Sequence, residues 1–354
     1  MDATYSLLKE LCEAFGPPGH EGDVALIMKK HLKGLGEFSQ DGLGSVICKK
    51  RGAADDPRIM VAGHLDEVGF MVKGITPEGF IKFLPMGGWW GHVVLAQRVK
   101  IRTKKGDVVG VVGSKPPHEL KEEERRKVLD LADMFIDVGA TSYYDVKKKL
   151  GIRAGDVIVP DAPFQSMANE RLYLGKAIDN RYGCAVVVDV LKKLQKTPHP
   201  NSFYGVATTM EEVGIRGAQT SVTAVKPHVA IAVDVGIAHD TPGTIGEGEE
   251  KLGAGVGILV YDATMIPNRK LRDLAVETCK REKIPYHLGT VERGGTDAGR
   301  FHIFNTGVPS LVIFIPTRYI HSHTTIMDRK DYDASVRLIA ALTKRLDKKT
   351  VASL

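Results

Sequence analysis

The chain has 354 residues, of which 43% are hydrophobic and 26% charged, and it carries a formal net charge of +6. This balance excludes a largely disordered chain, and so small a positive charge does not by itself indicate nucleic-acid binding. At about 150 residues per domain, the length predicts two domains.

Cysteine usage and hydrophobicity indicate a cytoplasmic protein. The four cysteines, Cys12, Cys48, Cys184 and Cys279, include no CxxC pair and do not resemble a disulfide framework. Reduced, mostly buried thiols are typical of the cytoplasm. The sequence has no run of about 18 apolar residues and no basic segment leading into an apolar one at the N-terminus, so we expect neither a membrane span nor a signal peptide.

The first part of the chain predicts two helices followed by strands. Apolar residues recur at helical spacing in residues 4–15 and 22–35, and the Gly-Pro-Pro-Gly segment 16–19 ends the first helix. Residues 45–50 and 58–66 have the composition of short strands.

A β-rich segment follows between residues 69 and 113. Its short strand-like runs are separated by TPEG and KKGD turns, which is typical of a small β unit. The charged segment 119–139 is predicted to form a helix with a solvated face.

Helices alternate with strands again from about residue 165. The predicted helices cover residues 180–195, 213–225, 267–283 and 330–348. The apolar run 309–316 is typical of a buried central strand. We therefore predict an α/β domain with a helix-covered sheet, residues 1–66 plus 164–354, interrupted by a β-rich domain at residues 67–163.

Acidic and imidazole side chains recur where the predicted strands end. These candidate site residues are His64, Asp66, Asp179, Glu211, Glu212, Asp234 and His321. Loops beyond the carboxyl ends of strands in an α/β sheet are where ligands bind, so these junctions offer their side chains to one region. Zn²⁺ accepts imidazole nitrogen and carboxylate oxygen, and Co²⁺ or Mn²⁺ suits the same set.

The inventory fits a site for two metal ions. Such a site needs ions about 3.5–4 Å apart, a bridging carboxylate and further ligands on each ion. One assignment satisfies this need: Asp179 bridges, His64 and Asp234 hold one ion, and Glu212 and His321 hold the other. Glu211 then remains free to act as a general base toward a metal-activated water.

Other interpretations stay open at this point. Asp179 is also a suitable helix N-cap, the adjacent glutamates a solvated helix start, and no HExxH motif fixes a metal. A glycoside hydrolase would use paired carboxylates, but Glu211 and Glu212 are adjacent and cannot readily flank a glycosidic bond at about 5–9.5 Å. A non-catalytic, metal-stabilised scaffold would have no need of a free Glu211. The basic C-terminal helix lacks the interleaved aromatics of a nucleic-acid site.

Six motifs carry a family resemblance. GHLDEVGF, KAIDNRYGC, MEEVGIRGA, VDVG, GGTDAG and PTRYIHS occur in the order and spacing that resemble the dinuclear aminopeptidases of metallopeptidase family forty-two. That family includes tetrahedral (TET), deblocking and glutamyl aminopeptidases, and some members have been labelled cellulase M or endoglucanase. The resemblance runs nearly end to end and implies release of N-terminal amino acids from peptides. We expect a broad or neutral-aliphatic preference, with glutamyl or aspartyl residues next.

The resemblance also implies a role for each matching residue. The implied ligands of two divalent ions, Zn²⁺ or Co²⁺, are His64, Asp179 as the bridge, Glu212, Asp234 and His321. Glu211 is implied as the base, and Asp66 orients His64 or tunes the metal. Because the motif here continues as His321-Ser322-His323, His323 competes for the place of the last ligand. Gly295, Thr296 and Asp297 are expected either to present backbone to the substrate or to form a tight turn.

Finally, the resemblance implies an assembly. The catalytic domain would be a zinc-peptidase-like domain with a mixed sheet, and residues 67–163 a PDZ-like dimerisation domain. Dimers would associate into a hollow tetrahedral dodecamer. Peptides are the expected partners, and neither nucleic acid nor a membrane is.

Overall fold

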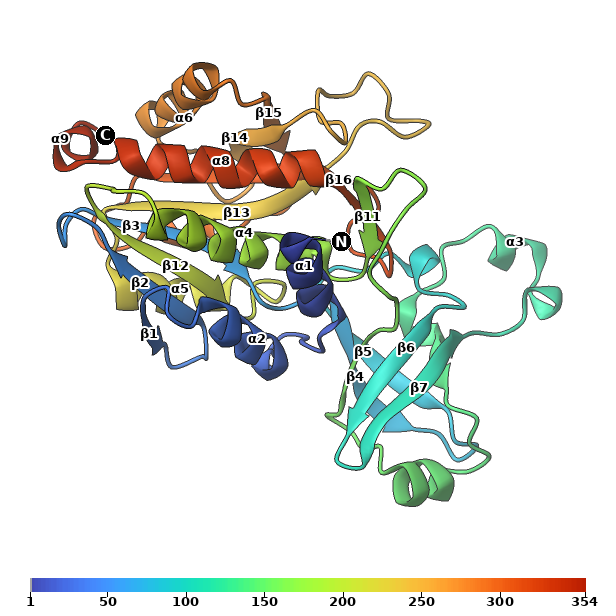
Figure 1. Cartoon of the computed structure of the whole chain (residues 1–354). Coiled ribbons are helices and arrows are strands. Elements are labelled where there is room, and N and C mark those ends of the chain that lie inside the picture. The colour runs from blue at the N-terminus through green and yellow to red at the C-terminus, as the bar shows by residue number, and fades with distance from the viewer. Residues whose placement is uncertain (1) are drawn as a thin grey trace.

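The computed structural model describes residues 2–354 and consists of a helix-covered sheet and a smaller closed β-barrel (Figure 1). All barrel strands lie between residues 69 and 160, whereas the large sheet is built from segments before and after them. The predicted fold class, a mixed α/β sheet with a small β-rich unit, is confirmed. Within residues 2–354, no helix is both long and apolar enough to cross a membrane.

The large sheet has eight strands of mixed direction. In spatial order they are β1 (Glu37–Gln40), β2 (Val46–Arg51), β12 (Ser202–Thr208), β3 (Arg58–His64), β13 (Val229–Ile237), β16 (Ser310–Thr317), β14 (Val256–Asp262) and β15 (Tyr286–Val291). The central strands β12, β3, β13 and β16 are parallel to their neighbours in this group. Their carboxyl ends therefore meet at one edge of the sheet, the place where α/β proteins bind ligands.

Helices cover both faces of the large sheet. One face carries α1 (Ala3–Glu13), α2 (Gly22–Leu32), α4 (Ile178–Gln195), α6 (Arg269–Glu282) and α8 (Arg329–Arg345), and the other carries α5 (Arg216–Val225) and α7 (Ala298–Phe301). Successive side chains of a strand point to opposite faces. Ile231 of β13 therefore packs in the first core, while Ala230 and Ala232 pack in the second.

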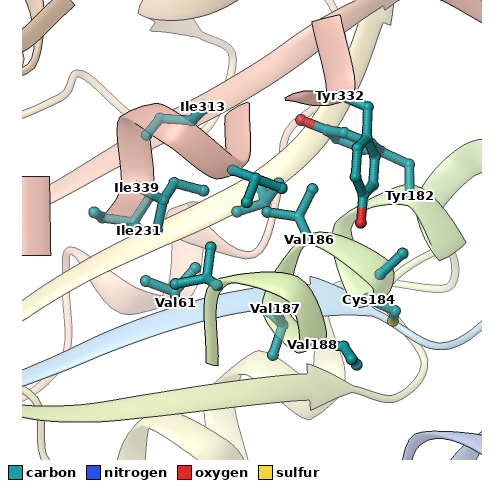
Figure 2. Close-up of a cluster of buried hydrophobic side chains, with 14 of the residues drawn as sticks. Val61, Tyr182, Cys184, Val186, Val187, Val188, Ile231, Ile313, Tyr332 and Ile339 are labelled. Carbon is teal, nitrogen blue, oxygen red and sulfur yellow. The ribbon is translucent and has the colours of Figure 1, made fainter. Parts of the chain in front are cut away.

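The first of these cores anchors α4. Aliphatic side chains from three neighbouring strands, among them Val61, Ile231 and Ile313, form its floor (Figure 2). The rings of Tyr182 on α4 and Tyr332 on α8 meet edge to face with their centroids 6.0 Å apart. Such aromatic pairs add to the stabilisation from burial. The packing fixes the start of α4 beside the carboxyl ends of the central strands.

The barrel has six strands around a core of its own. In barrel order they are β4 (Gly69–Ile75), β5 (Ile81–Met86), β8 (Phe135–Asp137), β7 (Gly106–Gly113), β6 (Arg98–Thr103) and β9 (Val157–Pro160). Its core includes Phe70, Phe83 and Ile136 and is separate from the two cores of the large sheet. Figure 1 shows the barrel to one side of the helix-covered sheet, so the chain leaves after β3 and returns after β9.

The helix predicted at residues 119–139 is wrong for most of its length. Within this segment α3 covers only Glu122–Arg125, and β8 occupies part of the remainder. Ile136 pairs with Val112 of β7 and is fully buried in the barrel core. Burial of this short apolar stretch therefore outweighs the helix propensity of the charged residues before it, which find no surface to pack against and stay exposed.

The remaining elements are short. They are the three-stranded sheet of β10 (Gln165–Ser166), β11 (Leu172–Gly175) and β17 (Thr325–Asp328), the helical turns η1 (Gly91–Val93), η2 (Pro117–Glu119), η3 (Leu131–Asp133) and η4 (Asp145–Leu150), and α9 (Lys348–Ala352). The last helix, predicted as continuous over residues 330–348, is divided in two. Leu346 leaves the helical conformation, and the Asp347 side chain accepts a hydrogen bond from the backbone of Thr350 to begin α9.

Candidate dinuclear metal centre

Three side chains from three elements converge at the carboxyl ends of the central strands. His64 ends β3, Asp234 lies near the end of β13, and Asp179 begins α4. His64 Nε2 lies 3.2 Å from Asp179 Oδ1 and 4.0 Å from Asp234 Oδ1. One ligand atom of each residue lies within 4.8 Å of the other two, so the three form a group of the size that holds a metal ion.

A second group shares Asp179 with the first. His321 Nε2 lies 3.3 Å from Asp179 Oδ2 and 3.5 Å from Glu212 Oε2. Here too one ligand atom of each residue lies within 4.8 Å of the other two. Asp179 thus faces one group with Oδ1 and the other with Oδ2, which is the arrangement that a carboxylate bridge between two ions requires.

Asn180 holds the shared carboxylate in place. Asp179 and Asn180 interrupt the helical conformation at the start of α4. The Asn180 amide donates to the carbonyl of Val233 at 2.7 Å, and its oxygen accepts from the backbone of Gly183 at 2.9 Å. These bonds tie the first turn of α4 to β13, next to Asp234. Sequence reasoning missed Asn180, because only its position beside Asp179 marked it.

Asp66 connects the two glutamates to His64. This carboxylate is fully buried and accepts hydrogen bonds from the backbone N–H groups of Glu211 and Glu212, each at 3.0 Å. His64 Nδ1 contacts the carbonyl oxygen of Asp66 at 3.1 Å. A proton on Nδ1 leaves Nε2 as the free nitrogen, and Nε2 is the one that faces Asp179 and Asp234.

Burial makes the negative charges of this cluster unfavourable without a counter-charge. Burial raises the pKa of Glu211 and Asp234 well above the usual values, against the lowering effect of His64. Burial and the Asp179 charge raise the pKa of Glu212 to about 8. Divalent cations would offset this clustering of carboxylates.

The two histidines respond to the same carboxylates. Burial lowers the pKa of His64, but hydrogen bonds to Asp179 and Asp66 outweigh it and raise that pKa well above its usual value. Burial likewise lowers the pKa of His321, yet Asp179 and Glu212 raise it to about 9. Burial raises the pKa of Asp179, but its hydrogen bonds to both histidines hold it below the usual range.

These residues fit a pair of divalent cations. Glu212 Oε1 is buried and has no hydrogen-bond partner among residues 2–354, so this oxygen is free to bind a ligand. The donor set of imidazole nitrogens and carboxylate oxygens is one that Zn²⁺ and Co²⁺ accept. Glu211 belongs to neither three-residue group, but its Oε2 lies 3.9 Å from His64 Nε2, at the border of the first.

The remaining candidates, His323 and the segment around Gly295, belong to neither three-residue group. The buried His323 ring packs against Trp89, with ring centroids 5.6 Å apart, and belongs to neither group. Asp297 is buried and accepts from Thr208 Oγ1 at 2.6 Å, and burial raises its pKa to about 6. Gly295 packs against Thr264, where a Cβ would lie 2.3 Å from the nearest atom. Thr208 and Thr264 had no signal in the sequence.

Comparisons with known proteins agree on one family. A sequence model of the family described as M42 glutamyl aminopeptidase matches residues 44–338. A glutamyl aminopeptidase of Lactococcus lactis subsp. cremoris is 35% identical, with 99% of this chain and 98% of that protein covered. A lysyl aminopeptidase of Pyrococcus furiosus is 33% identical, with 97% of each covered.

Solved structures give the same picture. A TET aminopeptidase from a marine sediment archaeon, Thaumarchaeota archaeon SCGC AB-539-E09, has a TM-score of 0.96 and 46% identity over 99% of each chain. The TET1 peptidase of Pyrococcus horikoshii, described as able to assemble into a tetrahedron or a large octahedral shell, has a TM-score of 0.86 and 28% identity over 97% of this chain and all of that one. A Thermotoga maritima protein described as an endoglucanase has a TM-score of 0.77 and 29% identity over 98% of each chain.

Proposed function

This chain belongs to the M42 glutamyl aminopeptidase family and is a metal-dependent aminopeptidase, and from that premise we propose that its active site is the pair of residue groups that share Asp179. His64 and Asp234 would hold one divalent ion, Glu212 and His321 the other, and Asp179 would bridge them. The observation that carries this proposal is that Asp179 turns one oxygen toward each histidine, at 3.2 Å and 3.3 Å.

The reaction proposed is hydrolysis of the first peptide bond of a peptide. When bound, the two ions would lower the pKa of a shared water and polarise the scissile carbonyl. Glu211 would accept the proton of that water and return it to the leaving amine. Burial raises the pKa of Glu211 well above its usual value, which suits a group that holds a proton between two steps. Asp66 would act as a positioning residue, through its bonds to Glu211, Glu212 and His64.

Exchange of Glu211 for glutamine tests this assignment. Glu211→Gln keeps the size of the side chain but cannot accept the proton, so we expect turnover of aminoacyl-p-nitroanilides to fall at least about 100-fold. Metal content, measured by elemental analysis of the same samples, should stay at the wild-type level. The matched control is Glu277→Gln on the exposed surface of α6, which should change neither quantity. Near wild-type turnover in Glu211→Gln with full metal content would rule out the role as base.

Removal of the Asp179 carboxylate should lower metal content, unlike the exchange of Glu211. In Asp179→Ala both groups lose a shared carboxylate, so we expect metal content and activity to fall together. Wild-type protein stripped by a chelator should regain activity when Zn²⁺ or Co²⁺ is added back, and the more effective ion identifies the better cofactor. Full metal content in Asp179→Ala would contradict the proposed bridge.

The substrate preference proposed is broad or neutral-aliphatic, with acidic residues next. Characterised relatives at similar identity differ in their named specificity, one being glutamyl and the other lysyl, so family membership alone does not decide it. A panel of aminoacyl-p-nitroanilides compared by kcat/KM tests the preference. A strong preference for lysyl substrates would refute it. The endoglucanase description of one neighbour finds no support in the site, because adjacent Glu211 and Glu212 are not placed on two sides of a sugar bond.

We further propose that residues 67–163 are a dimerisation domain and that dimers associate into a tetrahedral dodecamer in the cytoplasm. The assembly of the Pyrococcus horikoshii relative into a tetrahedron supports self-association of this kind, and four free, buried cysteines are consistent with a reducing compartment. Mass measurement of the native protein should give twelve times 38.6 kDa. A stable monomer at micromolar concentration would overturn the proposed assembly.

A further inference from the structure

Backbone from the barrel lies directly against one of the two residue groups. The loop after β5 contains Gly87 and Gly88, and an added Cβ at Gly87 would lie 3.1 Å from Glu212 Oε2. An added Cβ at Gly88 would lie 3.1 Å from His321 Nδ1 and 3.5 Å from His321 Cε1. Two members of the Asp179–Glu212–His321 group are therefore in contact with the inserted barrel, although all three belong to the helix-covered sheet or its loops.

His321 is less enclosed by its own domain than His64 is. The His321 side chain is 37% exposed, against 2% for His64, and its backbone has the positive φ of 54°. His64 Nδ1 contacts Asp66, two residues away on the same strand end. The Nε2 atom of His321 faces Asp179 and Glu212, which leaves Nδ1 turned toward the barrel loop.

Trp89 contacts both the barrel core and the loop that carries His321. Its indole N–H donates to the carbonyl of Gly69 at 3.0 Å, and its ring stacks on Phe70 of the barrel core at 4.6 Å between centroids. The Trp89 ring also packs against His323, which follows His321 by two residues. The indole therefore connects the barrel core with the loop that carries His321.

We propose that the barrel completes the Asp179–Glu212–His321 site: the Gly88 backbone orients the His321 ring, and Trp89 holds that backbone in register. The inference rests on the metal centre proposed above. A histidine that binds a metal through one ring nitrogen almost always donates the other N–H to a carbonyl or carboxylate, and loss of such a partner costs about 10- to 100-fold in metal affinity. The affinity of this one site then depends directly on where the barrel sits, while the His64 site is affected only through the shared Asp179.

An added side chain at position 88 would press on the His321 ring. A side chain there would displace the His321 ring by a few tenths of an ångström, since 3.1 Å is tighter than ordinary contact with a Cβ. Gly88 is exposed and has no positive φ, so alanine introduces no backbone strain. Gly87 is less suitable for a test, because its φ is +85° and a Cβ there would also lie 2.7 Å from Val68.

The test is a titration of chelator-stripped, full-length protein with Co²⁺. Isothermal titration calorimetry measures the binding. In Gly88→Ala we expect one of the two binding events to weaken at least about 10-fold and the other to change less than about 2-fold. Trp89→Leu should weaken the same event without adding an atom near the site. Asp234→Asn, which alters the His64 group, should weaken the other event and so identify each one.

Gly74→Ala is the matched control, because a Cβ at this barrel position meets nothing within 4 Å. It should leave both events unchanged, and the thermal unfolding of Gly88→Ala and Gly74→Ala in chelator should match that of the wild type. If the wild type shows two binding events and both are unchanged in Gly88→Ala and in Trp89→Leu, this inference is wrong, but the proposed metal centre stands. A wild-type chain that binds no ions would overturn the proposed centre, and the inference with it.

Discussion

At the scale of single residues, Asp66 contacts three residues of the proposed active site. Its two oxygens accept the backbone N–H groups of Glu211 and Glu212, and its main chain contacts His64. The residue proposed as the base and two of the proposed ligands are thus contacted by one buried residue. A carboxylate suits this position because it has two acceptor oxygens and no donor.

We expect Asp66→Asn to disturb this arrangement without changing its volume. The amide keeps one acceptor and turns an NH₂ group toward a backbone N–H, so one hydrogen bond is lost and two donors face each other. Activity should fall at least about 10-fold, with weaker metal binding in a titration. Asp55→Asn, at an exposed carboxylate, is the control. Unchanged kcat/KM in Asp66→Asn would show that these contacts do not position the site.

The sequence predicted which residue types gather at the site, but not how they are held. His64, Asp179 and Asp234 were found because each stands at a junction of strand or helix. Asn180 and Thr208 were not, since their contacts depend on how close two backbones approach. The contact of Gly88 with His321 joins segments more than 200 positions apart, and no local pattern encodes such a meeting.

At the scale of elements, the amphipathic α/β segments were predictable and the insertion was less so. Strands such as β13 and β16 are nearly continuous apolar runs, as buried strands in a helix-covered sheet must be. The segment 119–139 was misread because local charge spacing favours a helix, whereas the three residues of β8 are held by barrel pairing. Short strands of this kind depend on tertiary contacts, which a single sequence does not display.

The edge strand β15 carries a buried histidine that should make stability depend on pH. His287 packs edge to face on Phe314, and neither of its ring nitrogens has a partner among residues 2–354. Burial lowers the pKa of His287, and Glu250 and Glu249 only partly oppose this. Since the unfolded chain takes up a proton at about pH 6.5 and the folded chain does so only at lower pH, the stability contribution is lost as pH falls below about 6.5.

Thermal unfolding of the wild type and His287→Leu from pH 7.5 to 5.5 checks this sign. We expect this fall in pH to cost the wild type more stability than it costs His287→Leu, with a difference of up to about 1.4 kcal/mol at pH 5.5. His118→Leu, at an exposed histidine, should follow the wild type. Parallel pH profiles for the wild type and His287→Leu would mean that His287 takes up its proton equally well in the folded chain.

At the scale of the whole molecule, a buried ion network joins the barrel to the sheet. Glu67, which lies between β3 and β4, contacts Lys176 Nζ with both oxygens at 2.7 Å, and Arg181 Nη2 at 3.3 Å. Lys176 also donates to the carbonyl of Ala14 at 3.1 Å, and Arg181 to that of Gly16 at 3.1 Å. The root of the insertion, the end of α1 and the start of α4 are therefore held by the same buried charges.

Removal of one partner from this network should be costly. In Lys176→Met the Glu67 carboxylate loses its closest cation while still buried, and we expect a loss of about 3 kcal/mol or more. Urea unfolding followed by tryptophan fluorescence suits the test, because both tryptophans, Trp89 and Trp90, lie in the barrel loop beside the junction. Lys30→Met removes an exposed ion pair with Glu10 and should cost no more than about 1 kcal/mol. Equal midpoints for the two variants would refute the structural role of the network.

Because the barrel is inserted into the sheet domain, the site residues are synthesised in a fixed order around it. A growing chain presents His64 first, then the whole barrel with its separate core, and only afterwards Asp179, Glu212, Asp234 and His321. Domains generally fold as units during synthesis, so the barrel, with Gly88 and Trp89 in place, is ready before the carboxylates emerge from the ribosome. Neither group is complete until Asp179 has been made, and the second waits for His321, close to the end of the chain. If the two groups bind metal as proposed, neither ion can be fully bound until late in synthesis, and a truncated chain that stops before residue 321 lacks one ligand of the second group.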